Sequence, residues 1–242
     1  MPAVAAATSE HSHATDALPP TPADAAHVLG LIGGYQLSQA VYVAARLRLA
    51  DLIAAGECTT EGLARRTGAV PDRLHRLLRS LSAHGVFTQT GDDAWGMTPA
   101  AQTLRSDAPG SLHSMALMWN EEHYEAFANL TDAVLGERSA FEHRFGTDWW
   151  SYLAEHPDSS ATFNAAMANL GRQVHAAAAG AADLSGVDHL VDVGGGAGAL
   201  TAGLLERHPG LAATLVDLPH VLPAADDLLT GRGARPRHAL PR

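Results

Sequence analysis

The stretch with the clearest chemistry is a cluster of four glycines, Gly194, Gly195, Gly196 and Gly198, which directly follows the short apolar run of residues 190–193. An apolar run of this length that ends in glycines is typical of a buried strand that turns tightly into a helix. Glycine has no Cβ atom, so a ligand can approach the backbone of such a turn closely. The sequence therefore predicts a ligand-binding turn, followed by a helix over residues 199–207.

An acid marks the next strand of the same unit. Residues 213–216 form a second apolar run, and Asp217 closes it roughly 20 residues beyond the first glycine. A carboxylate at this place can accept hydrogen bonds from both ribose hydroxyls of an adenosine. The strand–helix–strand unit thus predicts the start of an open α/β sheet that binds an adenosine-containing cofactor.

Two cofactors compete for this loop, and a turn without any ligand is a third reading. Gly194, Gly196 and Ala199 satisfy the dinucleotide pattern G-x-G-x-x-G/A, whereas Asp192 extends the pattern to D-x-G-x-G-x-G. An acid inside the first strand would repel a pyrophosphate and attract an ammonium group. S-adenosylmethionine carries an amino group and a sulfonium but no phosphate, so we favour it over a nicotinamide dinucleotide.

The residues before the loop divide into three segments. Residues 1–25 are rich in Ala, Pro, Ser and Thr and predict a disordered tail. Residues 26–110 begin with a long apolar helical stretch, which Gly33 and Gly34 are expected to split into two helices. A helix ending at Gly68, a helix from Pro71 and a hairpin follow, an order that predicts a winged helix.

A winged helix raises the alternative of a DNA-binding regulator. Arg73, Arg76 and Arg79 on the second helix could meet phosphates, but Asp92 and Asp93 in the hairpin turn would be repelled. The net charge of −10 also disfavours a polyanionic partner. We therefore predict no nucleic-acid partner.

Residues 111–186 predict a helical connector rich in aromatic side chains. Trp149, Phe163 and Met167 are candidates for lining a substrate pocket, and packing in an apolar core is the alternative for each of them. Residues 163 and 167 are four apart and therefore share one face of a helix.

Composition limits the remaining possibilities. The single cysteine, Cys58, excludes an intramolecular disulfide and a thiolate metal site, and His11 and His13 are interpreted as solvated, so no metal is predicted. The N-terminus has no signal-peptide pattern, and we find no apolar run of about 18 residues, so we predict no membrane span and a cytoplasmic protein.

With these residues in hand, the chain from about residue 27 to 225 resembles the actinobacterial small-molecule O-methyltransferases, relatives of caffeate-type and polyketide-modifying enzymes. The matching stretches are GGYQLSQAVYVAARLRLADLI, TTEGLARRTGAVPDRLHRLLRSLSAHGVF, EEHYEAF, FEHRFG, FNAAM, VDVGGGAGAL and LVDLPHV. The resemblance implies an S-adenosylmethionine-dependent enzyme that methylates a hydroxyl of a small aromatic or polyketide metabolite. It also implies a homodimer formed through the N-terminal domain.

The resemblance assigns roles to individual residues. Gly194, Gly196 and Gly198 would shape the cofactor loop, Asp192 would lie near the methionine amino end, and Asp217 would bind the ribose. Leu218 would flank the adenine. Phe163 and Met167 would lie near the sulfonium or the acceptor.

The expected fold class is α/β, with an all-α winged-helix N-terminal domain and a Rossmann-like methyltransferase sheet over residues 187–242. That sheet is expected to be incomplete, with about two strands, because the tail after Leu229 shows no strand pattern. The family's His base would lie on a later segment, and His238, between prolines in an unstructured tail, does not match it. We therefore expect a C-terminally truncated chain with no catalytic residue and weak turnover, or alternatively a non-catalytic partner of a full-length relative.

Overall fold

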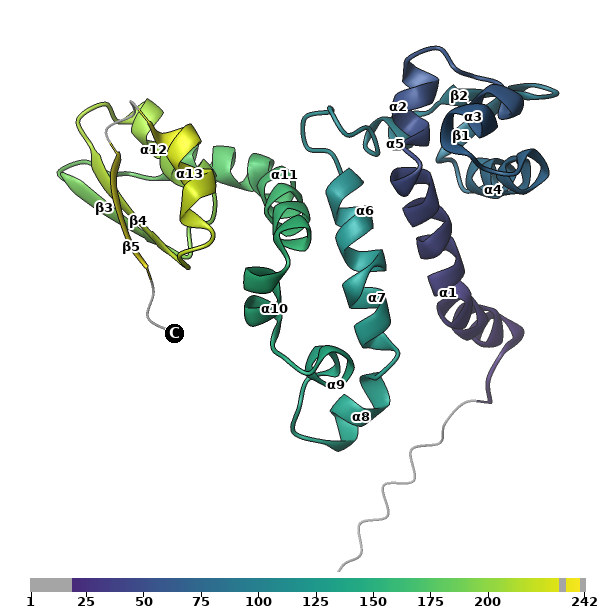
Figure 1. The fold of residues 1–242 in the computed structure, drawn as a ribbon, viewed down its shortest axis with the longest axis horizontal. Helices are drawn as coiled ribbons and strands as arrows, with labels where there is room; N and C mark the ends of the chain where they lie inside the picture. The colour runs from purple at the N-terminus through teal and green to yellow at the C-terminus, as the bar shows by residue number, and fades with distance from the viewer. Residues whose placement is uncertain (1–18, 231–233, 240–242) are drawn as a thin grey trace, which may run out of the picture. The chain divides into compact units, whose positions relative to one another are not determined.

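The computed structural model describes residues 19–230 and 234–239 (Figure 1). Its first part comprises α1 (Pro22–Arg46), α2 (Leu49–Ala54), α3 (Thr60–Thr67), α4 (Pro71–Ala83), β1 (Phe87–Gly91), β2 (Ala94–Met97) and α5 (Pro99–Gln102). The connector comprises α6 (His113–Asn120), α7 (Glu122–Phe127), α8 (Leu130–Leu135), α9 (Ala140–Phe145), α10 (Trp149–Glu155) and α11 (Pro157–Ala181). The last part comprises β3 (His189–Val193), α12 (Ala199–Arg207), β4 (Ala212–Asp217), α13 (Leu222–Leu229) and β5 (Ala234–Ala239).

Helix α1 differs from the sequence prediction in where it begins and in its continuity. It begins at Pro22, inside the predicted tail, and it continues through Gly33 and Gly34 without a break. A glycine inside a helix costs about 1 kcal/mol relative to alanine, which weakens a helix without forbidding it. The chain instead turns at Arg48, which has a left-handed backbone with φ of 54° and precedes α2. Residues 1–18 of the predicted tail lie outside the described residues.

The described residues divide into two units, with the boundary between Gln36 and Leu37. In the described part of the first unit, α1 exposes a series of large apolar side chains: Val28, Leu29, Leu31, Ile32 and Tyr35. With 25 residues and a mean hydropathy of 1.2 in its most apolar window, α1 meets the length and composition that a membrane span requires. Core helices and signal sequences meet the same criterion, so the predicted absence of a membrane span stays a prediction.

Helices α3 and α4 and the β1–β2 hairpin occur in the predicted order around one apolar core. The Thr59 side chain caps α3, and Gly68 ends it with a φ of 75°. Helix α4 buries the face that carries Leu74, Leu78 and Leu81. The indole of the buried Trp95 donates a hydrogen bond of 2.9 Å to the Thr60 hydroxyl, so this core contains no unpaired indole N–H.

The C-terminal sheet is parallel, with the strand order β3-β4-β5. Strand β4 alternates between half-buried and buried residues, and Ala213, Leu215 and Asp217 point to the buried face. Helices α12 and α13 cover that face and share one apolar cluster with it. The opposite face of β3 exposes Val191 and Val193. One face of the sheet is thus packed, and the other is open along β3.

Strand β5 is a correction to the expected two-stranded sheet and unstructured tail. Residues 234–239, including Pro236 and His238, pair in parallel with β4. A proline lacks the backbone donor that an inner strand needs, but it is tolerated at a sheet edge, which is where β5 lies. The short Arg- and Pro-containing run has no alternation to reveal the strand, and pairing with β4 supplies its register.

Candidate cofactor-binding site

The predicted strand–turn–helix is present: α12 has the predicted bounds, and β3 begins one residue earlier, at His189. The turn after β3 is fixed to the next strand, because the Gly194 N–H donates to the Val216 carbonyl over 2.7 Å. Gly194, Gly196 and Gly198 all have positive φ angles, of 73°, 58° and 79°. A side chain is strained at such angles, which explains the glycine at these places. A Cβ atom on Gly194 or Gly196 would meet no other heavy atom within 4 Å, so the turn leaves room for a ligand there.

Asp217 lies at the carboxyl end of β4, beside this turn. One oxygen of its carboxylate accepts the Gly196 N–H and the other accepts the Leu218 N–H, each over 2.7 Å. Asp217 is itself buried, with 9% of its surface exposed. The carboxylate therefore does more than the sequence suggested, because it also holds the glycine turn in place. Each oxygen keeps a lone pair for a ribose hydroxyl.

Asp192 lies on β3 and faces the helix that follows the turn. Its Oδ2 atom accepts a hydrogen bond of 2.5 Å from the hydroxyl of Thr201, which is fully buried in the first turn of α12. The sequence singled out Asp192 but not Thr201. The sequence offered one signal for Thr201. It is the third residue of the predicted helix, so its side chain lies in the first helical turn, close to the end of the strand that carries Asp192.

At Gly195 the surrounding side chains leave no room for a Cβ atom. A Cβ atom at this position would lie 2.3 Å from Leu215 Cδ1 and 2.6 Å from Asp192 Oδ2. Both distances are shorter than any stable contact between such atoms. Only glycine therefore fits between the Asp192 carboxylate and the strand core.

These features fit an adenosine cofactor that has an amino-acid end. The turn is open above Gly194 and Gly196, Asp217 supplies a carboxylate at the adjoining strand end, and Asp192 supplies a second one close to the helix. Leu218 is half-buried and follows Asp217 directly. The individual roles of these residues, including Leu218 beside the adenine, stay predictions.

The three predicted pocket residues come together in the connector. The rings of Trp149 and Phe163 meet edge to face with centroids 5.8 Å apart. Phe163 and Met167 pack against Met115, Met118 and Ala166. Further rings join Trp149 in one aromatic cluster: Phe141, Phe145, Tyr152 and His123. The contacts are those of an apolar core, and the role of these residues in binding a substrate stays a prediction.

Helix α11 links this cluster to the cofactor loop. Its early part carries Phe163 and Met167 and contacts α6, and its last part places Ala179 in the cluster with α12. The segment from Met167 to Ala179 is about 18 Å long in an α-helix. One continuous helix thus carries two of the predicted pocket residues and part of the packing behind the loop.

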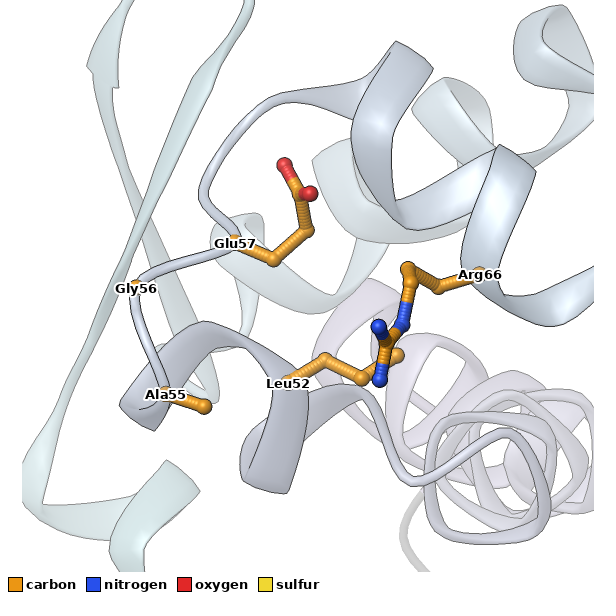
Figure 2. Close-up of a pocket in the computed structure, with 5 residues that line it drawn as sticks. All are labelled: Leu52, Ala55, Gly56, Glu57 and Arg66. Carbon is orange, nitrogen blue, oxygen red and sulfur yellow. The ribbon is translucent and has the colours of Figure 1, made fainter.

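A separate pocket of about 310 Å³ lies far along the chain from this loop. Figure 2 shows the Glu57 carboxylate and the Arg66 guanidinium on the two sides of the pocket, which Leu52, Ala55 and Gly56 complete. It contains none of the residues predicted to bind the cofactor or the substrate.

Comparisons with known proteins agree with this geometry. Residues 29–107 match the O-methyltransferase dimerisation domain, and residues 127–238 match the O-methyltransferase domain. The chain belongs to the O-methyltransferase family. The family membership and the cofactor of the family, S-adenosylmethionine, are those that the sequence predicted. The predicted domain boundaries at residues 26, 111 and 187 stay predictions.

Two curated relatives of this O-methyltransferase family member are named for phenazine compounds. The phenazine O-methyltransferase PhzM of Lysobacter antibioticus is 40% identical over 210 residues, which cover 87% of this chain and 62% of the relative. The phenazine-1-carboxylate N-methyltransferase of Pseudomonas aeruginosa is 36% identical over 218 residues, which cover 90% of this chain and 64% of the relative. The chain thus spans less than two thirds of the length of these relatives.

Solved structures are similar over most of this chain. The crystal structure of LaPhzM has a TM-score of 0.83 and 38% identity, and the match covers 90% of this chain and 66% of that one. An O-methyltransferase from neocarzinostatin biosynthesis, solved with S-adenosylmethionine and 2-hydroxy-5-methyl naphthoic acid, has a TM-score of 0.73 and 33% identity. That match covers 84% of this chain and 64% of the other.

Proposed function

We propose that this chain binds S-adenosylmethionine at the loop between β3 and α12 and serves in methyl transfer to a small aromatic metabolite. The observation that carries the proposal is the position of Asp217, buried at the end of β4 and hydrogen-bonded to the Gly196 amide of the turn. The cofactor supplies a methyl group on a sulfonium, which is already activated for transfer. The chain's own residues bind and orient the reactants, and alignment of this kind provides much of the rate.

The acceptor we propose is a hydroxyl on an aromatic or polyketide-type ring. Relatives named for phenazine and for hydroxylated benzoate and naphthoate substrates support the aromatic class, and one relative named as an N-methyltransferase makes nitrogen the alternative acceptor. The aromatic cluster around Trp149 and Phe163 supports a planar substrate, because flat rings stack or meet edge to face with such side chains.

We further propose that the 242-residue polypeptide by itself transfers methyl groups weakly. The family pattern puts the His that removes the acceptor proton on a segment that follows the one matched here, and general bases typically contribute a factor of about 10²–10⁴ to the rate. Methyl transfer by the purified polypeptide at a rate typical of enzymes would contradict this proposal.

A second role, as a dimerisation partner, is favoured by the exposed apolar face of α1. Leu29, Leu31 and Ile32 are each at least 66% exposed and lie in the segment that matches the dimerisation domain. An apolar surface of this kind is buried when two copies associate. We propose a homodimer, and a mixed dimer with a longer relative is the alternative that co-purification would identify.

The cofactor proposal is tested by calorimetric titration of the chain with S-adenosylhomocysteine. We expect binding by the wild-type chain and, in Asp217→Asn, a loss of about tenfold or more, because a charged acceptor of two backbone N–H groups is lost. Asp183→Asn is the matched control, since that exposed carboxylate also accepts a backbone N–H, from Ser185, but lies outside the loop. Equal affinities for the wild type and Asp217→Asn would contradict the proposed ribose site.

A further inference from the structure

We infer that Thr201 is a positioning residue, which holds one oxygen of Asp192 so that the other is available to the α-ammonium group of S-adenosylmethionine. The inference rests on the cofactor proposed above. It concerns a residue that no sequence motif singled out. Three observations on Thr201, Gly195 and Asp192 carry it.

The first observation is the contact itself. Thr201 Oγ1 donates to Asp192 Oδ2 over 2.5 Å, and the Thr201 side chain has no exposed surface. A buried hydroxyl that donates to a carboxylate forms a charge-assisted hydrogen bond, which is shorter and stronger than a neutral one. Branching at Cβ limits threonine to two χ1 rotamers in a helix, and the bond to Asp192 together with full burial selects one of them. The hydroxyl is therefore a fixed donor that comes from α12 to a strand residue.

The second observation is the crowding on the same side of the carboxylate. Oδ2 lies only 2.6 Å from where a Cβ atom of residue 195 would be. The backbone of Gly195 thus lies close to Oδ2 on one side, and Thr201 holds it on another. Rotation of the carboxylate about its Cβ–Cγ bond would break the Thr201 contact, so the carboxylate plane is fixed.

The third observation is the state of the other oxygen. None of the residues that the structure describes donates a hydrogen bond to Asp192 Oδ1, and Asp192 is half-buried, not enclosed. An oxygen that carries negative charge and has no protein donor is suited to a cationic ligand group. An ammonium is the cation that the amino-acid end of the cofactor offers, and attraction between unit charges is strong where water is partly excluded.

Comparing the binding of two ligands distinguishes a positioning role of Thr201 from a role in stabilising the loop. One is S-adenosylhomocysteine, and the other is its analogue with hydrogen in place of the α-amino group. A residue that only stabilises the loop affects both ligands equally. A residue that acts through Asp192 on the ammonium affects only the ligand that carries it. Binding is measured by calorimetry, which needs no turnover.

The variant Thr201→Val keeps the side-chain shape and removes the hydroxyl. We expect about tenfold weaker binding of S-adenosylhomocysteine and less than about a twofold change for the deaminated analogue, as for the loss of one hydrogen bond to a charged group. Thr201→Ser keeps the donor and should restore wild-type affinity for both ligands. Thr214→Val is the matched control, because it removes a hydroxyl that contacts the His189 ring, on the opposite face of the same sheet.

Thermal unfolding verifies that each variant is folded, and Thr201→Ala replaces Thr201→Val if the latter fails to fold. Equal losses for the two ligands, or no loss for either, would overturn the inference and leave the cofactor proposal standing. A wild-type chain that binds neither ligand would overturn both. Selective loss for the amino-bearing ligand, with rescue by serine, is the result we expect.

Discussion

Gly195 is the residue at which the loop has the least room, and this leads to a prediction for Gly195→Ala. The added methyl group would overlap Leu215 Cδ1 and Asp192 Oδ2, at 2.3 Å and 2.6 Å. Relieving overlaps of this kind typically costs about 1–3 kcal/mol of stability. We expect a lower denaturant midpoint and weaker binding of S-adenosylhomocysteine, measured by urea unfolding and by calorimetry.

Gly210 provides the control for this substitution. It lies in the loop before β4, and a Cβ atom there would meet nothing within 4 Å. Gly210→Ala should leave both quantities unchanged or raise the stability slightly, since alanine restricts the unfolded chain. If Gly195→Ala behaved like Gly210→Ala, the crowding argument would be wrong.

The sequence predicted that Asp192 and Asp217 belong with the glycine turn, but not the groups to which they bond. Asp192 and Asp217 follow from their spacing to the glycines, because that spacing reflects the geometry of a strand, a turn and a strand. Thr201 could not be assigned in the same way. A threonine in the first turn of a helix usually bonds to nearby backbone groups, and only the folded sheet shows that its partner is a carboxylate on β3.

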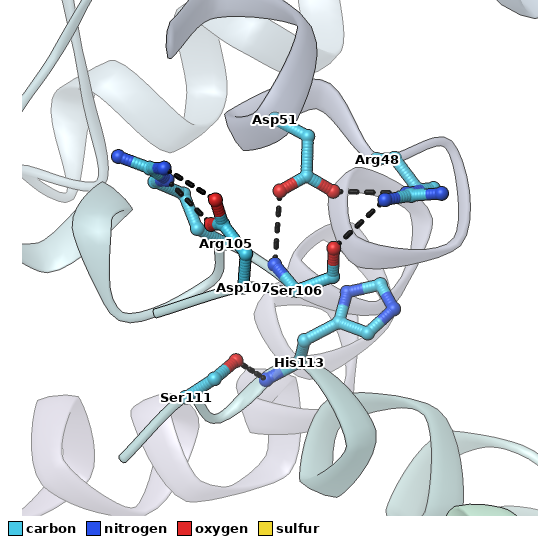
Figure 3. Close-up of polar contacts among 7 residues, drawn as sticks. All are labelled: Arg48, Asp51, Arg105, Ser106, Asp107, Ser111 and His113. Carbon is cyan, nitrogen blue, oxygen red and sulfur yellow. Dashed lines mark hydrogen bonds and ion pairs between the residues drawn. The ribbon is translucent and has the colours of Figure 1, made fainter. Parts of the chain in front are cut away.

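At the scale of elements, a polar network joins α2 to the loop at Ser106, between α5 and α6. Asp51 accepts from the Arg48 side chain and from the Ser106 N–H, and Arg48 also donates to the Ser106 hydroxyl. Figure 3 shows His113, at the first position of α6, next to this network. The pKa of His113 is lowered below its usual value, because the effect of burial outweighs the opposing effect of the nearby Asp51 carboxylate. The Nδ1 atom of His113 is buried without a hydrogen-bond partner among the described residues.

This pKa shift predicts a loss of stability at mildly acidic pH. Above about pH 6.5 the ring is neutral in both the folded and the unfolded chain. As the pH falls below that value the unfolded chain binds a proton first, so the free energy of unfolding decreases until the pH reaches the lower pKa of the folded state. We expect His113→Gln to reduce the slope of this free energy between pH 7 and pH 5, measured by urea unfolding at each pH.

His143→Gln is the control for that measurement. His143 lies on α9 and is exposed, whereas His113 is half-buried. The control variant should keep the wild-type slope. An unchanged slope in His113→Gln would show that other groups cause the pH dependence.

The sequence predicted the boundaries of some helices correctly but missed the extent of α1 and the presence of β5. Helix α4 and the loop helix α12 have clear boundaries, Pro71 at the start of one and the glycine turn before the other, and both were located correctly. Gly33 and Gly34 misled the prediction for α1, because a glycine lowers helix stability without setting a boundary. Strand β5 was missed because a short edge strand owes its conformation to pairing with β4.

At the scale of the whole molecule, the apolar face of α1 predicts association. Leu29 is 69% exposed and lies inside the dimerisation match. In Leu29→Glu a charge would have to be buried in the interface, which is strongly unfavourable. We expect the wild-type chain to sediment as a dimer and Leu29→Glu to sediment as a monomer in analytical ultracentrifugation.

Leu135→Glu is the matched control for association. Leu135 on α8 is 82% exposed but lies outside residues 29–107. Its substitution should leave the dimer intact. A wild-type monomer, or recovery of the chain only with membranes, would contradict the dimer and favour the alternative that the length and composition of α1 permit.

The bond between Asp217 and the Gly196 amide has a consequence for the thermodynamics of ligand binding. Together with the bond from Gly194 to Val216, it fixes the loop before any ligand arrives. Binding then carries little of the entropic cost of ordering a flexible segment. The heat-capacity change on binding should accordingly reflect only the apolar surface that the ligand covers, without the larger negative contribution that accompanies coupled folding.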